Sequence, residues 1–148
     1  MTNEIKTKQY ANWLTFIGIL LFLFGLLVAF FIPLMANPRM GLSAHLEGTM
    51  NGMFLVILGL IWNKILLTDK WLTTAFMLSI YGAFANFVAV IIAALTGAGK
   101  MMPIAGGKEG VLLVEGIISF LLISLALAMV LVCGIVLAGL YKYIKQSS

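Results

Sequence analysis

The chain has 148 residues, of which 63% are hydrophobic and only 9% are charged, and its mean hydropathy is +1.15. Soluble domains carry about 25% charged residues, so this composition excludes an ordinary water-soluble domain, and the high hydrophobicity excludes a disordered chain. The net charge of +4 comes from scattered lysines rather than from a basic face, so we expect no nucleic-acid partner. The composition therefore predicts an integral membrane protein whose surroundings are the lipid bilayer.

Stretches without charge predict where the chain crosses the membrane. Residues 9–38, 71–99 and 116–141 are free of charge, and each stretch exceeds the roughly 20 residues that a helix needs to span the bilayer. A fourth stretch, 48–63, is long enough only if its helix begins near Leu42. No stretch alternates strictly, as a strand of a membrane barrel would. We therefore predict an all-α integral membrane protein, a four-transmembrane-helix bundle in one domain over 1–148, with helices near 13–35, 42–66, 71–95 and 111–141.

The basic residues predict how this bundle is oriented. Six lysines fall on the side that holds both termini and the second loop, and three basic residues fall on the other side. The first group is Lys6, Lys8, Lys64, Lys70, Lys142 and Lys145, and the second is Arg39, Lys100 and Lys108. Because cytoplasmic segments are enriched in lysine and arginine, we expect both termini in the cytoplasm of a bacterial-type inner membrane. The glycine-rich loop 96–110 lacks the spacing of a phosphate-binding loop, and we expect a flexible lid there.

The second predicted helix carries an unusual polar stretch, AHLEGTMNGM, over residues 44–53. It holds His45, the only histidine of the chain, together with Glu47 and Asn51. Ionisable side chains in membrane helices are rare and usually mark function, since a charged carboxylate at the bilayer centre costs ~2.5 kcal/mol or more. A wetted position at the interface would equally explain His45 and Glu47. Asn51 lies roughly 9 Å further in, and it needs a partner on another helix or a ligand. Asn86, midway along the third helix, raises the same question, and two facing amides are the simplest packing alternative.

The spacing within this stretch indicates two separate faces. Small residues recur at every fourth position, namely Ala44, Gly48 and Gly52. Such a stripe permits the close approach of another helix or of a flat ligand. At 100° per residue, Asn51 lies about 120° around the helix from His45, so His45 can address one object while Glu47 and Asn51 address another. Helix packing alone explains the glycines, whereas a planar cofactor with His45 as its ligand explains the histidine too. Haem iron is commonly bound by one proximal histidine, while zinc needs three or four clustered ligands.

The stretch AHLEGTMNGM, in the second helix of a small four-helix membrane protein, resembles the AHxxxxxNGM stretch of the styrene oxide isomerase family. A weaker match is YGAFAN, which ends at Asn86. The resemblance implies a homotrimer that holds haem b at the subunit interface, with His45 as the proximal iron ligand. The small-residue spacing would place Gly48 and Gly52 beside that cofactor. The resemblance further implies that ferric iron acts as a Lewis acid on an epoxide oxygen, and that Asn51 helps to position a small apolar substrate.

The family pocket also uses an aspartate and a tyrosine of the third helix, and the sequence departs from it there. In gapless register with Asn86 these positions are Gly82 and Val90, neither of which has a polar side chain. Tyr81 is adjacent to Gly82, but its side chain points about 100° away from that position, because neighbouring helical residues are rotated by that angle.

We therefore expect a membrane haem b isomerase that converts epoxides to carbonyl compounds, with Asn51 as the catalytic residue and Glu47, Tyr81 and Asn86 as further pocket candidates. A membrane haem protein for electron transfer or gas sensing, and an assembly factor without cofactor, are the alternatives.

Overall fold

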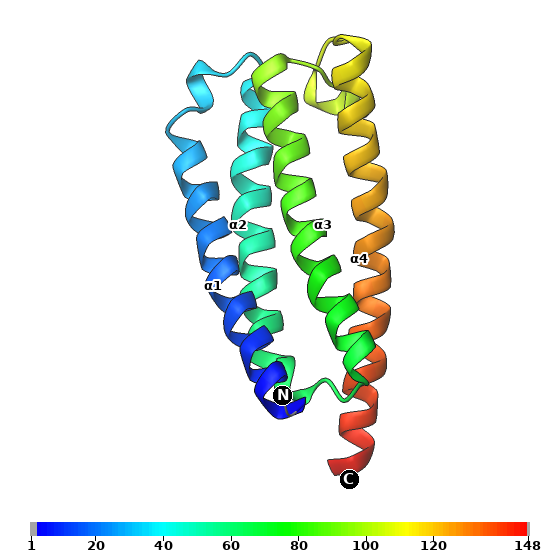
Figure 1. The fold of residues 1–148 in the computed structure, drawn as a ribbon. Coiled ribbons are helices and arrows are strands. Elements are labelled where there is room, and N and C mark those ends of the chain that lie inside the picture. The colour runs from blue at the N-terminus through cyan, green and yellow to red at the C-terminus, as the bar shows by residue number, and fades with distance from the viewer. Residues whose placement is uncertain (1–2, 148) are drawn as a thin grey trace.

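A computed structural model of the chain describes residues 3–147 and contains four long helices (Figure 1). These are α1 (Asn3–Ala29), α2 (Pro38–Ile61), α3 (Asp69–Thr96) and α4 (Leu112–Ser147), with short 3-10 turns η1 (Ile32–Leu34), η2 (Trp62–Lys64) and η3 (Pro103–Ala105). All four long helices are long and apolar enough to cross a membrane. The described residues form no extended strand, only one isolated bridge between Ala98 and Lys108. The predicted all-α membrane fold is confirmed.

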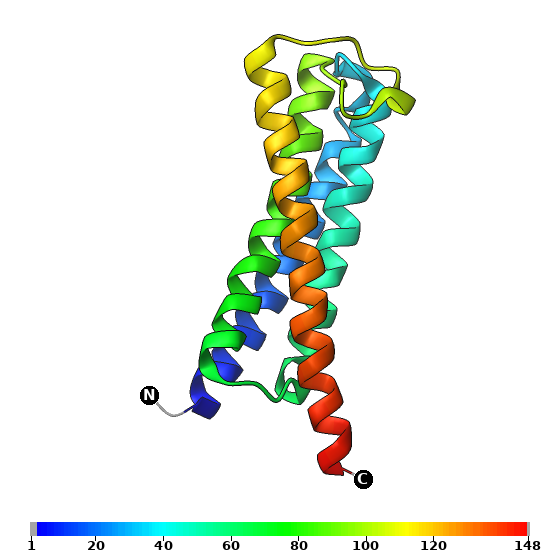
Figure 2. The same cartoon turned by 90° about the vertical axis from the view of Figure 1, so that its right-hand side faces the viewer.

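The helices form an elongated bundle in which α2 packs against both α1 and α3, and α4 packs along α3 (Figures 1 and 2). The beginning of α1 and the end of α4 lie at the same end of the bundle, together with the loop between α2 and α3 (Figure 1). The loop between α3 and α4 lies at the opposite end, beside the start of α2. His45 on α2 and Asn86 on α3 therefore belong to helices that are direct neighbours.

The first helix differs from its predicted range of 13–35, since it runs from Asn3 to Ala29. Pro33 explains where it ends. Proline lacks the backbone N–H, and its ring clashes with the carbonyl of the residue four positions earlier, which here is Ala29. The chain continues through the 3-10 turn η1, which contains Pro33 near its start.

The second helix begins at Pro38, four residues before the predicted Leu42, and ends at Ile61 rather than at residue 66. Asn37 is the N-cap, and its side-chain oxygen accepts a hydrogen bond from the Met40 backbone N–H at 3.3 Å. Asparagine at the cap followed by proline at the first helical position is a strong start signal. The third helix lies close to its predicted range, while α4 extends past residue 141 to Ser147.

Glycines bring the backbones of α1 and α2 into direct contact. A Cβ atom added at Gly48 would lie 2.5 Å from Gly25 Cα, and one added at Gly52 would lie 2.6 Å from Phe22 N. Both distances are shorter than real Cβ contacts, so only glycine fits at these positions. The small-residue stripe of α2 therefore packs against α1 of the same chain. This differs from the expectation that Gly48 and Gly52 lie against a planar cofactor, because the α1 backbone occupies that surface.

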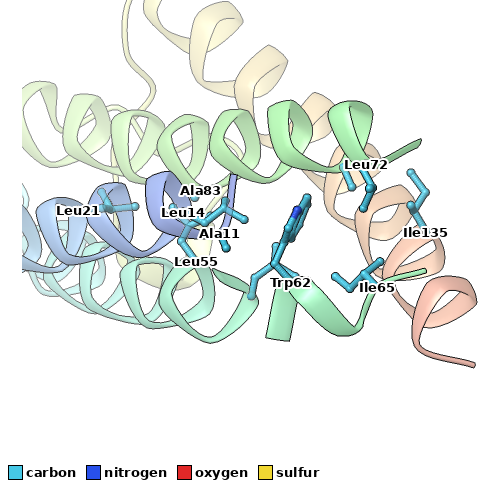
Figure 3. Close-up of a cluster of buried hydrophobic side chains, with 11 residues drawn as sticks. Ala11, Leu14, Leu21, Leu55, Trp62, Ile65, Leu72, Ala83 and Ile135 are labelled. Atoms are coloured by element: carbon cyan, nitrogen blue, oxygen red, sulfur yellow. The ribbon is translucent and has the colours of Figure 1, made fainter. Parts of the chain in front are cut away.

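Hydrophobic packing closes the end of the bundle that holds the α2–α3 loop. Trp62 is fully buried there among side chains of α2, α3 and α4, including Leu72 and Ile135 (Figure 3). The edge of its ring meets Tyr10 and Phe76, which stack on each other with their centroids 4.3 Å apart.

Hydrogen bonds hold the α3–α4 loop in place at the opposite end. Asn37 donates from its backbone N–H to Ala94 O at 3.0 Å and from its side-chain amide to Ala105 O at 3.3 Å. The buried Glu115 carboxylate accepts from the backbone N–H groups of Gly110 and Lys100. The loop is thus tied to α2 and α4, in contrast to the flexible lid expected from its glycine content.

Replacing Gly48 by alanine tests the backbone contact between α1 and α2. We expect Gly48→Ala to lower the free energy of unfolding by about 1–3 kcal/mol, because the new methyl group must displace the α1 backbone. Gly134→Ala is the matched control, since nothing lies within 4 Å of a Cβ there. Thermal unfolding in detergent, followed by helix content, measures both. Equal stability of the two variants would contradict the close contact.

Candidate functional site

Three polar side chains of α2 lie well inside the membrane span. Since α2 begins at Pro38, His45 is about 10 Å and Glu47 about 13 Å from the start of the helix, and Asn51 is a further turn in. The earlier start of the helix moves His45 and Glu47 deeper than their sequence-predicted place in the first turns. All three side chains are half-buried within the single chain.

The imidazole of His45 is oriented by the backbone of α1. Its Nδ1 lies 2.8 Å from Gly25 O. A carbonyl oxygen can only accept, so Nδ1 carries the proton and donates, which leaves the lone pair of a neutral ring on Nε2. Metal-binding histidines are commonly held in this way, with the second ring nitrogen bonded to a backbone carbonyl. His45 is therefore oriented as a ligand that offers Nε2.

An apolar groove lies further along the α1–α2 pair. Val56, one of its lining residues, follows His45 by three helical turns, about 16 Å along α2. The groove has a volume of about 330 Å³ and is lined by Ile19, Phe22, Met53, Val56 and Ile57. A neutral imidazole nitrogen is the donor that haem iron takes, so His45 fits the cofactor that the sequence resemblance implies. The α1 sides of Gly48 and Gly52 contact the α1 backbone.

Glu47 joins two asparagines of neighbouring helices. Its Oε2 accepts from Asn51 Nδ2 at 3.2 Å on α2 and from Asn86 Nδ2 on α3. The structure thus brings together three predicted site residues, here called the Glu47 cluster: Glu47, Asn51 and Asn86. The asparagines do not face each other, as the packing alternative supposed, because the carboxylate lies between them. The cluster fixes the orientation of both amides within the membrane-spanning parts of α2 and α3.

The Glu47 cluster and His45 lie on different sides of α2. His45 reaches α1, whereas Glu47 reaches α3. This agrees with the angular separation of about 120° between His45 and Asn51.

The third helix places its other candidates elsewhere. Tyr81 donates to or accepts from Ser124 on α4, with 2.5 Å between the hydroxyl oxygens, so its hydroxyl points to α4 and not to the Glu47 cluster. Gly82 faces Met129, whose sulfur would lie 2.5 Å from an added Cβ. Val90 is buried against α2 in the second apolar cluster. Tyr81 is thus separated from Asn86 by about 140° around α3, which explains why it does not join the pocket.

Sequence reasoning missed two groups that shape the site. The Gly25 carbonyl has no side-chain signal, and only the glycine itself could have suggested a close approach. Asn37 was recognisable, because asparagine followed by proline is a helix start signal, and it would have placed His45 at the correct depth.

Comparison with known proteins shows the family of the chain. The sequence model of the styrene oxide isomerase family matches residues 10–141. The chain belongs to the styrene oxide isomerase family. It is 52% identical to hydroxylaminobenzene mutase HabB of Ectopseudomonas oleovorans over 126 residues, which cover 84% of this chain and 77% of that protein. It is 44% identical to hydroxylaminobenzene mutase HabA of the same organism over 127 residues, covering 84% of this chain and 94% of that protein. No solved structure matches the chain. The family and these relatives support an isomerase or mutase activity.

Proposed function

We propose that this protein is a membrane mutase that rearranges aryl hydroxylamines without net oxidation or reduction. The observation that carries the proposal is the 52% identity to a hydroxylaminobenzene mutase over most of the chain. In hydroxylaminobenzene the group that a mutase can move is the hydroxyl on nitrogen. Its transfer to the ring breaks one N–O bond and forms one C–O bond, while the ring carbon loses a proton and the nitrogen gains one. The product is an isomeric aminophenol, so atoms and electrons balance without a co-reactant.

We propose haem b as the cofactor, with His45 as its proximal ligand through Nε2. When bound, haem supplies a ferric Lewis acid for the substrate oxygen. The contribution of the chain is to fix the histidine through Gly25 and to keep the site apolar and dry. In such a site an oriented amide counts most, so Asn51 is the group that we expect to orient the substrate oxygen or to stabilise charge on it.

A second candidate reaction is the isomerisation of an epoxide to a carbonyl compound, which the family match favours. Both reactions break a bond to oxygen heterolytically and are redox-neutral. Gly82, which has no side chain, and the apolar Val90 count against the epoxide, because the corresponding family positions carry polar groups. We therefore rank the aryl hydroxylamine first.

For the assembly we propose a homotrimer in the inner membrane with haem at the subunit interface and both termini in the cytoplasm. The different directions of His45 and Asn51 on α2 support a site that two chains share. The six lysines at the end of the bundle that holds both described termini support the orientation.

Removing the histidine tests the cofactor. We expect His45→Ala to lose stoichiometric haem and its visible absorption while helix content stays unchanged, because the chain has no second imidazole. Met50→Ala is the control, since Met50 is a neighbouring thioether with 59% of its surface exposed. A pyridine haemochrome assay on both purified variants gives the haem content per chain. Full haem retention in His45→Ala would exclude His45 as the ligand.

Turnover of defined substrates tests the reaction. Haem-loaded ferric protein in nanodiscs should convert hydroxylaminobenzene to an aminophenol of the same mass, as measured by liquid chromatography. Asn51→Ala should slow this by about 10- to 1000-fold with haem still bound, the scale of one lost oriented donor. Styrene oxide is assayed in parallel. Conversion of styrene oxide alone would select the second candidate, and conversion of neither by haem-loaded protein would refute both.

Mixing two inactive variants tests whether two chains share the site. We expect His45→Ala and Asn51→Ala chains, co-expressed with different tags and purified through both, to recover a fraction of wild-type activity. Recovery follows because one interface then combines an intact His45 with an intact Asn51 of the partner. A tandem-purified mixture no more active than Asn51→Ala alone would show that each chain uses its own two residues.

A further inference from the structure

Glu47 is a carboxyl group within the membrane-spanning part of α2, with one oxygen engaged and one available. Its neighbour Asn86 lies about 15 Å from the end of α3, at a depth similar to that of Glu47 in α2. Both asparagine amides donate to Oε2. Within residues 3–147, Oε1 makes no hydrogen bond, and the side chain is half-exposed on the surface of the single chain.

An available acceptor at this depth has a chemical consequence. Water is scarce in the bilayer core, so an acceptor there lowers its free energy by binding a donor from another molecule. The amides of Asn51 and Asn86 hold the carboxyl group from two helices and so fix the direction of Oε1. A fixed acceptor selects ligands that carry an N–H or O–H group.

We propose that Glu47 is a specificity-determining residue whose Oε1 accepts a hydrogen bond from the N–H or O–H of the substrate. The inference rests on the proposed mutase function, because it names the group that recognises the aryl hydroxylamine. A hydroxylamine carries both an N–H and an O–H donor, whereas an epoxide carries only an acceptor oxygen. A site that is built to bond a substrate donor rejects analogues that lack it strongly, because its own polar group is then left unpaired. An acceptor at Glu47 thus favours the binding of hydroxylamines over that of epoxides.

The alternative is that Glu47 only clamps α2 to α3. A clamp would affect stability and would make no distinction between ligands with and without a donor. The two roles therefore differ in ligand preference, which can be measured without turnover.

A pair of unreactive probes tests the preference directly. Acetanilide has one N–H donor, and N-methylacetanilide replaces its hydrogen by a methyl group. We expect haem-loaded protein in nanodiscs to bind acetanilide at least tenfold more tightly, the scale of one net hydrogen bond. Equilibrium dialysis against empty nanodiscs of the same lipid measures this. Equal binding of the two probes by the wild-type protein would overturn the proposal, whether or not any variant folds.

Glu47→Gln keeps the shape of the side chain and tests the residue itself. The amide oxygen of glutamine can still accept from the asparagines, and its NH₂ group then replaces the free acceptor by a donor. We expect the probe preference to disappear and the KM for hydroxylaminobenzene to rise at least tenfold, with haem content unchanged. Glu109→Gln, the same substitution at an exposed loop position, should keep both. Retention of the preference in haem-loaded Glu47→Gln would overturn the assignment. A wild-type protein that shows the probe preference but does not convert hydroxylaminobenzene would refute the proposed reaction and leave Glu47 as a donor-binding residue.

Discussion

The contact between the backbones of α1 and α2 is the constraint on which the rest of the structure depends. Gly25 and Gly48 touch where no side chain fits, so the helices approach more closely than ordinary side-chain packing allows. That approach brings the Gly25 carbonyl within 2.8 Å of His45 and fixes which imidazole nitrogen carries the proton. With one face of α2 held against α1, the adjacent face carrying Glu47 is presented to α3. Two separate polar arrangements thus follow from one packing contact.

The bilayer-spanning helices carry few polar groups. In the site, His45 and Glu47 each use only one of their two polar side-chain atoms for hydrogen bonds within the chain. A polar side chain in a membrane helix usually finds a partner on a neighbouring helix. His45 uses one nitrogen and keeps the other, and Glu47 uses one oxygen and keeps the other. Hydrogen bonds between helices account for the engaged atoms. The remaining nitrogen and oxygen are the atoms that the proposed cofactor and substrate would use.

Much of the fold could be predicted from the sequence, because charge-free stretches and membrane thickness together fix the number of helices. The boundaries required local chemistry: Pro33 ends α1, and Asn37 with Pro38 begins α2 earlier than the hydrophobic pattern suggested. The separation of His45 from Asn51 followed from helical periodicity alone, since both lie on one helix. The hydrogen bonds between helices could not be predicted from periodicity. The Gly25 carbonyl has no sequence signal, and the bond between Glu47 and Asn86 depends on the rotation of α3, which also turns Tyr81 toward α4.

The same architecture can serve two reactions because the demanding part of each is the same. Opening an aryl epoxide and cleaving the N–O bond of an aryl hydroxylamine both leave positive charge that the aromatic ring can delocalise, and both retain the oxygen within the product. An apolar, water-excluding site favours rearrangement in either case, since water would otherwise capture the cation. The substrates differ in their hydrogen-bond donors: the hydroxylamine has an N–H and an O–H, whereas the epoxide has neither. In the proposed site, the Glu47 oxygen that the two asparagines leave available is the group that would distinguish the two substrates, while the helix contacts that orient His45 would be common to both reactions.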